Sequence, residues 1–148
     1  MNKKAKLKIL IAEDDKDLLA LYDKALPDLV FDKRLVINGE KALEAYKTWH
    51  PDILVLDIIM PVMTGYSALK EIREVLKNGN TTIVISTSID DMDEVSKCER
   101  LGIQGYIVKP FDYKKIAYEI LKFFKKNDPE RADVSRTRLE ALKKKAKV

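Results

Sequence analysis

Acidic side chains directly follow two of the most apolar runs in this sequence. The run Ile53-Leu54-Val55-Leu56 leads into Asp57, and the run Ile9-Leu10-Ile11-Ala12 leads into Glu13 and Asp14. Apolar runs of this length are typical of strands that are buried on both faces of a parallel sheet. Because ligands bind outside the carboxyl ends of the strands in such sheets, we expect these three carboxylates to lie together at a reactive edge.

A cluster of carboxylates favours protonation or the binding of a cation. Two carboxylates about 4 Å apart repel each other by about 4 kcal/mol at an effective dielectric constant near 20. The chain has a single histidine, His50, and a single cysteine, Cys98, so the available metal ligands are oxygen atoms. Oxygen ligands favour a hard cation, and the pattern therefore predicts a Mg²⁺ site, with Mn²⁺ or Ca²⁺ as substitutes.

Two further strand ends carry groups that bind phosphoryl oxygens. Thr87 closes the run that begins at Thr81, and Lys109 follows the run that begins at Gln104. An ammonium group and a metal ion neutralise phosphoryl oxygens, a hydroxyl group donates a hydrogen bond to them, and an aspartate can act as the nucleophile. An isolated Asp57 is more simply interpreted as the cap of a turn, but the matching ends of the other strands favour a phosphoryl site.

Strand and helix patterns alternate along the chain. The predicted strands cover 6–12, 30–37, 53–57, 81–87 and 104–108, and the predicted helices cover 18–26, 39–49, 65–76, 90–101 and 113–126. Asp15 is the expected N-cap of the first helix, and Gly102 the expected C-cap of the fourth. Strands that alternate with helices through short connections predict an α/β fold, with a parallel sheet covered on both faces.

Composition excludes several classes of protein. A length of 148 residues, 46% of them hydrophobic and 35% charged, predicts one globular domain. The sequence contains neither an apolar stretch long enough to span a membrane nor a signal peptide with a cleavage site. The lone Cys98 excludes an internal disulfide and favours a reducing, cytoplasmic location, and the lone His50 argues against histidine metal cages and Ser-His-Asp triads.

Four motifs, taken in order, resemble the response-regulator receiver domains of two-component signalling, the family of the single-domain chemotaxis regulator. They are Ile9–Asp15, Asp57–Gly65, Ile83–Ser88 and Gly105–Phe111, and the resemblance covers roughly residues 5–126. Each motif is weak alone, but the ordered set with its spacing is specific. The resemblance implies a flavodoxin-like, doubly wound five-stranded sheet in the order 2-1-3-4-5 with five helices.

The resemblance also assigns roles to the acidic residues. Asp57 would be the phosphoacceptor. Asp14 would bind Mg²⁺ together with Asp57 and the backbone carbonyl of Ile59, while Glu13 would act through water. The acidic pair of the family can also be aligned with Asp14 and Asp15, but the alignment with Glu13 and Asp14 is favoured because it leaves Asp15 as the helix cap.

The remaining family positions fall on the fourth and fifth strands. Thr87 and Lys109 would bind the phosphoryl oxygens, and the Lys109-Pro110 peptide bond would be cis. Tyr106 would change rotamer as Thr87 moves toward the phosphoryl group, although an ordinary edge-strand aromatic is the simpler interpretation of this residue.

The function implied is a phosphorylation-dependent switch and not an enzyme, with self-phosphorylation and autodephosphorylation at most. Its partners would be a histidine kinase or phosphotransfer protein and an unknown effector, and it would be a monomer or a phosphorylation-induced dimer. Aliphatic Ile59 argues against an aspartate-based phosphatase, which needs a second acid there, and the acidic Glu13-Asp14-Asp15 loop argues against a flavodoxin-like FMN site. A pseudo-receiver that only docks partners, and a receiver belonging to a longer regulator, remain alternatives.

Residues 127–148 form a separate basic tail in this interpretation, outside the receiver domain of residues 1–126. The tail holds seven lysines and arginines against four acidic residues, so it carries +3 of the chain's formal net charge of +4. Residues 136–148 are predicted to be helical. This helix could be a solvated extension, the start of a linker to an output domain, or a contact for nucleic acid or a membrane surface. For the receiver domain without the tail, we expect no binding to nucleic acid or to a membrane.

Overall fold

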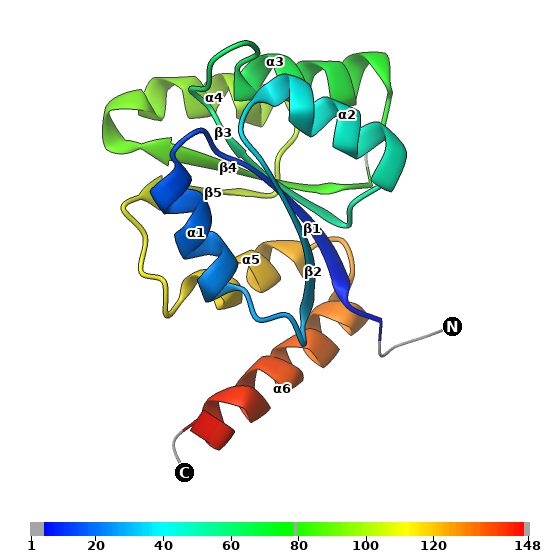
Figure 1. The fold of residues 1–148 in the computed structure, drawn as a ribbon. Coiled ribbons are helices and arrows are strands. Elements are labelled where there is room, and N and C mark those ends of the chain that lie inside the picture. The colour runs from blue at the N-terminus through cyan, green and yellow to red at the C-terminus, as the bar shows by residue number, and fades with distance from the viewer. Residues whose placement is uncertain (1–4, 79, 147–148) are drawn as a thin grey trace.

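A five-stranded parallel sheet forms the centre of the protein in a computed structural model that describes residues 5–78 and 80–146 (Figure 1). The strand order is β2-β1-β3-β4-β5, as the resemblance implies. The strands are β1 (Leu7–Ala12), β2 (Phe31–Val36), β3 (Ile53–Asp57), β4 (Thr82–Ser88) and β5 (Gly105–Lys109). Each lies within two residues of its predicted bounds.

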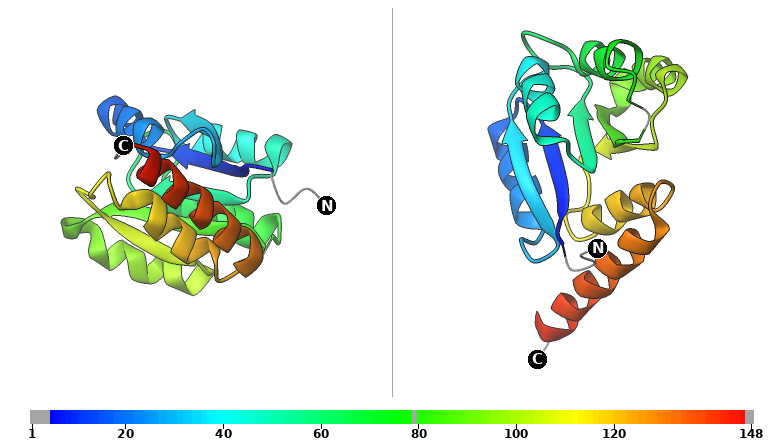
Figure 2. Two further views of the ribbon diagram at one scale, coloured as in Figure 1. Left: turned by 90° about the horizontal axis from the view of Figure 1, so that it is seen from below. Right: turned by 90° about the vertical axis from the view of Figure 1, so that its right-hand side faces the viewer.

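Helices cover both faces of the sheet (Figure 2). The helical elements are α1 (Lys16–Ala25), α2 (Gly39–Trp49), α3 (Gly65–Lys70), α4 (Met92–Leu101), α5 (Ile116–Phe124) and α6 (Pro129–Ala146). A π-helical turn, Glu71–Val75, extends α3, and a 3₁₀ turn, Ile89–Asp91, precedes α4. Asp15 caps α1 and Gly102 caps α4, as predicted.

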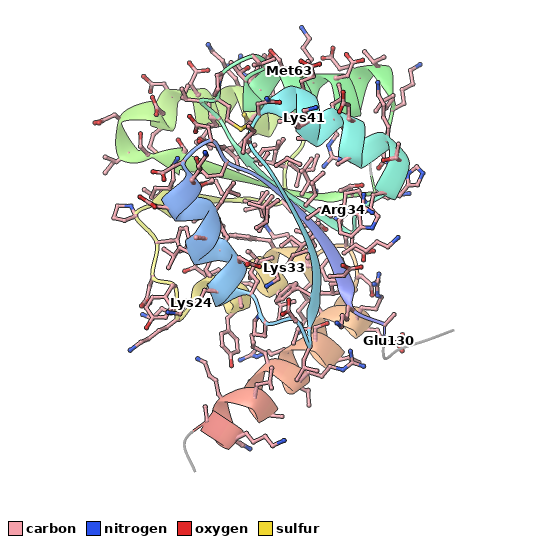
Figure 3. The ribbon with its side chains drawn as sticks, in the orientation of Figure 1. Lys24, Lys33, Arg34, Lys41, Met63 and Glu130 are labelled. Carbon is pink, nitrogen blue, oxygen red and sulfur yellow. The ribbon has the colours of Figure 1, made fainter. Side chains whose placement is uncertain are left out.

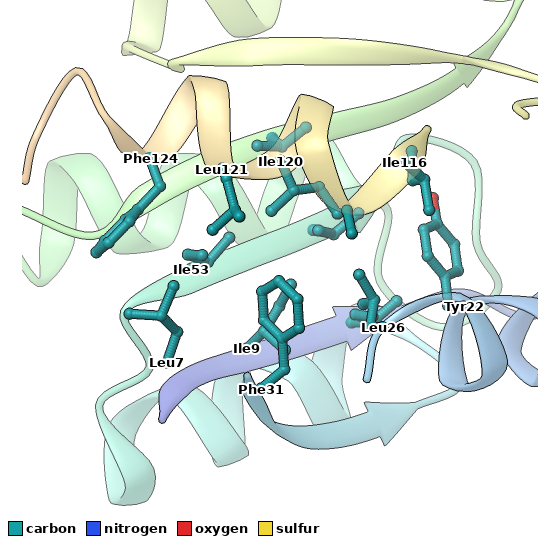
Figure 4. Packing of buried hydrophobic residues seen from close by; sticks show 14 of the residues in the cluster. Leu7, Ile9, Tyr22, Leu26, Phe31, Ile53, Ile116, Ile120, Leu121 and Phe124 are labelled. Carbon is teal, nitrogen blue, oxygen red and sulfur yellow. The ribbon is translucent and has the colours of Figure 1, made fainter. Parts of the chain in front are cut away.

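The central strands divide the core into two clusters because side chains alternate between the faces of a sheet. On one face, Ile9 and Ile53 pack against α1 and α5 (Figure 4). On the other, Leu10 and Leu54 pack against α2, α3 and α4. This two-sided burial explains the continuous apolar runs that precede Glu13 and Asp57.

Charged side chains occupy the edge strand β2. Lys33 lies 2.9 Å from Asp23 and 3.1 Å from Asp28, and the guanidinium of Arg34 lies 4.4 Å from the ring centroid of Trp49 (Figure 3 labels Lys33 and Arg34). Charge on an edge strand opposes the addition of a further strand from another molecule. The β2 side of the sheet is therefore protected against pairing with another strand.

The C-terminal helix α6 packs against the domain, so residues 5–78 and 80–146 contain six α-helices. It begins at Pro129, seven residues earlier than the predicted helix, because Asp128 accepts a hydrogen bond from the backbone N–H of Arg131 and proline suits the first helical position. Ala132 and Leu139 are buried in the same core cluster as α5. The last predicted tail residues, 147–148, lie outside the described residues.

Candidate functional site

Three strand ends bring the candidate site together at one edge of the sheet. Glu13 directly follows β1, Asp57 is the last residue of β3, and Lys109 is the last residue of β5. In the register of β1 and β3, Ala12 pairs with Leu56, so Glu13 and Asp57 are neighbours across the strands. The doubly wound sheet therefore places these side chains as the sequence predicts.

Three carboxylates form a compact cluster at this edge. Glu13, Asp14 and Asp57 each offer one oxygen atom, and these three atoms lie within 4.8 Å of one another. Glu13 and Asp57 are buried, whereas Asp14 is exposed. An all-oxygen set with one solvent-facing member fits a hard cation such as Mg²⁺, which keeps part of its water shell.

Lys109 supplies the positive charge that faces the two buried carboxylates. Its Nζ lies 3.3 Å from Oε1 of Glu13 and 3.3 Å from Oδ2 of Asp57. Burial lowers the pKa of Lys109, but its attraction to Asp57 and Glu13 outweighs burial and the net shift is upward. Lys109 is therefore a permanent cation in this site.

The two buried carboxyl groups resist simultaneous ionisation. Burial and, after it, the neighbouring Asp57 raise the pKa of Glu13 from its ordinary value of 4.5 to about 8, although the backbone N–H of Asp15 and the ammonium of Lys109 oppose the shift. Burial also raises the pKa of Asp57, against the lowering effects of Glu13 and Lys109. Both shifts disfavour two negative charges at this position, so the arrangement favours the arrival of positive charge.

Backbone groups hold the carboxylates in place. The N–H of Ile59 donates to Oδ1 of Asp57 at 3.3 Å, and the N–H of Asp15 donates to Oε2 of Glu13 at 3.2 Å. At Gly65, a Cβ atom would overlap the carbonyl oxygen of Asp57, so the first turn of α3 can approach β3 only with glycine there. The side chain of Ile59 points outward and is 54% exposed.

Thr87 and Tyr106 lie near the cluster in the fold, but the structure does not join them to it. The hydroxyl of Thr87 donates to the carbonyl of Ser88 at 3.1 Å. Tyr106 lies on β5 opposite Ile85 and is 41% exposed. The Lys109-Pro110 peptide bond is cis.

Two hydrogen bonds near the site escaped the sequence analysis. Tyr22 donates its buried hydroxyl to Ser86, the residue that pairs with Asp57 in the strand register, at 3.2 Å. Ser88 donates to Asp91 at 2.7 Å across the β4–α4 connection. Tyr22 lies in the apolar stripe of a helix, so the sequence predicts that it packs in the core and gives no indication of its hydrogen bond to Ser86. Ser88 and Asp91 are three residues apart, which is the spacing of a side-chain cap, and this signal was available in the sequence.

No helix among residues 5–78 and 80–146 is both long and apolar enough to cross a membrane.

Comparison with proteins of known sequence gives relatives among regulators. A protein of Porphyridium aerugineum described as "Probable transcriptional regulator ycf27" is 31% identical over 123 residues, which are 83% of this chain and 50% of the relative. The chemotaxis protein CheY of Halobacterium salinarum is 39% identical over 74 residues, which are 50% of this chain and 60% of the relative. The chain spans about half the length of the ycf27 relatives that it matches.

Comparison with solved structures gives the same fold. The REC domain of AraT, a response regulator from Geobacillus stearothermophilus, aligns with a TM-score of 0.75 at 25% identity and covers 86% of this chain and 99% of its own. The chemotaxis response regulator CheY4 of Vibrio cholerae aligns with a TM-score of 0.73 and covers 80% of this chain and 99% of its own; at 23% identity, it supports the fold alone. The family model of the response regulator receiver domain matches residues 9–121, and the chain belongs to this family.

Proposed function

We propose that this protein is a signalling switch that accepts a phosphoryl group on Asp57. The observation that carries the proposal is the position of Asp57, a buried carboxylate held between an acidic cluster and the ammonium of Lys109. The chain belongs to the receiver-domain family of two-component signalling. The role of Asp57 as phosphoacceptor, and the roles of its neighbours, are part of the proposal.

The transfer begins from a phosphohistidine on a histidine kinase or a phosphotransfer protein. A carboxylate oxygen of Asp57 attacks phosphorus, an acyl phosphate P–O bond forms, and the P–N bond to the imidazole breaks. The leaving imidazole nitrogen takes up a proton, so charge and atoms balance. The protein's own contribution is to hold Asp57 in place through Ile59 and to set Lys109 beside the incoming oxygens.

Glu13, Asp14, Asp57 and the backbone carbonyl of Ile59 would hold Mg²⁺, with Mn²⁺ as a substitute. When bound, the metal ion supplies positive charge that neutralises phosphoryl oxygens. Residues of this chain perform the remaining tasks. Lys109 already neutralises part of the cluster, and exposed Asp14 leaves the site open to solvent and to a partner.

Phosphorylation would reorganise the end of β4. A phosphoryl group adds roughly 1.5 to 2 negative charges to Asp57. The Thr87 hydroxyl, which now donates to its neighbour Ser88, would exchange that carbonyl for a phosphoryl oxygen. Tyr106 on the adjacent strand would then turn inward, and the surface formed by α4, β5 and α5 would change its population of conformers and thereby its affinity for an effector.

The direct test is phosphorylation of the full chain by acetyl phosphate with Mg²⁺, followed by intact mass spectrometry. Wild-type protein should gain one phosphoryl group and Asp57→Asn none. Asp32→Asn, which changes an exposed aspartate on the edge strand β2, is the matched control and should be labelled like the wild type. Equal labelling of Asp57→Asn would overturn the assignment.

A further inference from the structure

A concave basic groove lies between α5 and α6, remote in sequence from the carboxylate cluster. The two helices run side by side after the chain turns back near Asn127 (Figure 2). The groove between them has a volume of about 380 Å³. Its floor is formed by Tyr118, Leu121 and Ala132, and we refer to the whole as the α5/α6 groove.

The rim of the α5/α6 groove is strongly positive. Six lysines and arginines line it against two acidic residues, Glu119 and Asp133; the six are Lys114, Lys115, Lys122, Lys125, Arg136 and Lys143. Two of these cations have carboxylate partners, since Lys125 lies 3.0 Å from Asp133 and Arg136 lies 3.1 Å from Glu140.

The other rim cations are available to a ligand. Within the part of the chain that the structure describes, no carboxylate forms an ion pair with Lys114, Lys115 or Lys122, and all three are exposed. A concentration of unpaired positive charge beside a concave surface attracts and orients negatively charged partners.

The floor of the groove restricts the type of partner. Leu121 and Ala132 are almost fully buried at its base, so the partly exposed ring of Tyr118 offers the apolar contact of the floor, which phosphate groups cannot use. The ring of Tyr118 is covered by the ammonium of Lys143 at 4.4 Å from the centroid, so this face is not free to stack on a nucleic-acid base. A flat anionic membrane would meet the rim but leave the concave floor empty.

We propose that the α5/α6 groove binds an acidic peptide segment of a partner protein, with an apolar side chain on the floor and carboxylates against the rim. Helix α5 forms one wall of the groove, and its nine residues span about 13 Å along the helix axis. Extended chain of about four residues spans this distance. The interaction uses no atom of the carboxylate cluster, and its test is therefore independent of phosphorylation at Asp57.

The experiment uses the full chain and a fluorescein-labelled synthetic peptide in which a Leu-Phe pair is flanked on both sides by aspartates and glutamates. Binding is measured by fluorescence anisotropy at low salt. Lys114→Glu combined with Lys122→Glu reverses two exposed rim charges, and should lower the affinity by about tenfold. Replacing the Leu-Phe pair by Ser-Ser should also lower it by about tenfold, because the floor contact is then lost.

A matched control separates the groove from general charge attraction. Lys47→Glu combined with Lys70→Glu makes the same change in net charge at exposed positions of α2 and α3, and should alter the affinity by less than about threefold. Equal loss in both double variants would overturn the proposal, as would absence of peptide binding to the wild type.

Other occupants are tested with the same variants. The two alternative ligands are a single-stranded oligothymidylate and an anionic phosphatidylserine vesicle. If either binds more tightly than the peptide, and if Lys114→Glu combined with Lys122→Glu lowers its affinity, the peptide assignment is overturned in favour of that ligand. Light scattering that shows a dimer of the wild type, abolished by the rim reversals, would assign the groove to a second copy of the chain.

Discussion

Arg131 and Asp52 form a bidentate ion pair that joins the C-terminal helix to the opposite end of the sheet from the carboxylate cluster. The Nη1 and Nη2 atoms of Arg131 lie 2.9 and 3.0 Å from the two carboxylate oxygens of Asp52, which precedes β3. Asp52 also accepts the backbone N–H of Lys8 at 2.9 Å. Helix α6 is thus tied to β1 and to the start of β3.

Arg131→Ala should lower the free energy of unfolding by about 1 kcal/mol, because it leaves a half-buried carboxylate with fewer partners while solvent still screens part of the loss. Urea denaturation followed by circular dichroism measures this change. Arg136→Ala removes an exposed pair with Glu140 on the same helix and should cost less than about 0.5 kcal/mol. Equal effects of the two variants would contradict a special role for Arg131.

The stability of the metal-free protein should fall as pH rises from about 5 to 8. The pKa of Glu13 is about 8 in the folded state and 4.5 ordinarily, so its contribution is fully present below 4.5 and is lost as pH rises through 8. Thermal unfolding in the presence of a chelator measures the effect. Glu13→Gln should make the stability depend less on pH. Mg²⁺ should stabilise the wild type more at pH 8 than at pH 5.

Asp57→Asn and Lys109→Met should change stability in opposite directions at pH 8 without metal. Asp57→Asn removes one of two repelling carboxylates, and should raise the free energy of unfolding by about 1 kcal/mol. Lys109→Met removes the cation that lies 3.3 Å from the carboxylates of Glu13 and Asp57. It should lower the free energy of unfolding by about 1–2 kcal/mol. Denaturant midpoints compare the two; destabilisation by Asp57→Asn would show that repulsion is not the dominant interaction.

Gly65→Ala should damage the site and the fold together. A Cβ atom there would overlap the carbonyl oxygen of Asp57, so α3 or the end of β3 must shift. We expect a loss of about 1–3 kcal/mol in stability and slower labelling by acetyl phosphate. Ser67→Ala, on the exposed side of the same helix turn, is the control and should leave the labelling rate unchanged. Unchanged labelling of Gly65→Ala would mean that the loop adjusts without moving Asp57.

The sequence alone determined the strand and helix pattern, and it predicted which side chains meet at the carboxyl edge of the sheet. Unbroken apolar runs before Glu13 and Asp57 are required by strands that are buried on both faces, and parallel strands place their carboxyl ends at one edge. The positions of the carboxylates and of Lys109 at a common edge follow from this local pattern. The ordered motifs led to the receiver family, which the match over residues 9–121 confirms.

Only the tertiary structure decided how the side chains at that edge interact and where the tail lies. The hydrogen bond from Thr87 to Ser88, and the shared approach of Lys109 to two carboxylates, depend on side-chain torsions and burial that no local pattern encodes. The tail appeared separate because its charge dominates its composition. Its packing depends on Ala132 and Leu139 meeting the core and on Arg131 meeting Asp52, and such contacts between residues far apart in sequence exist only once the sheet has formed.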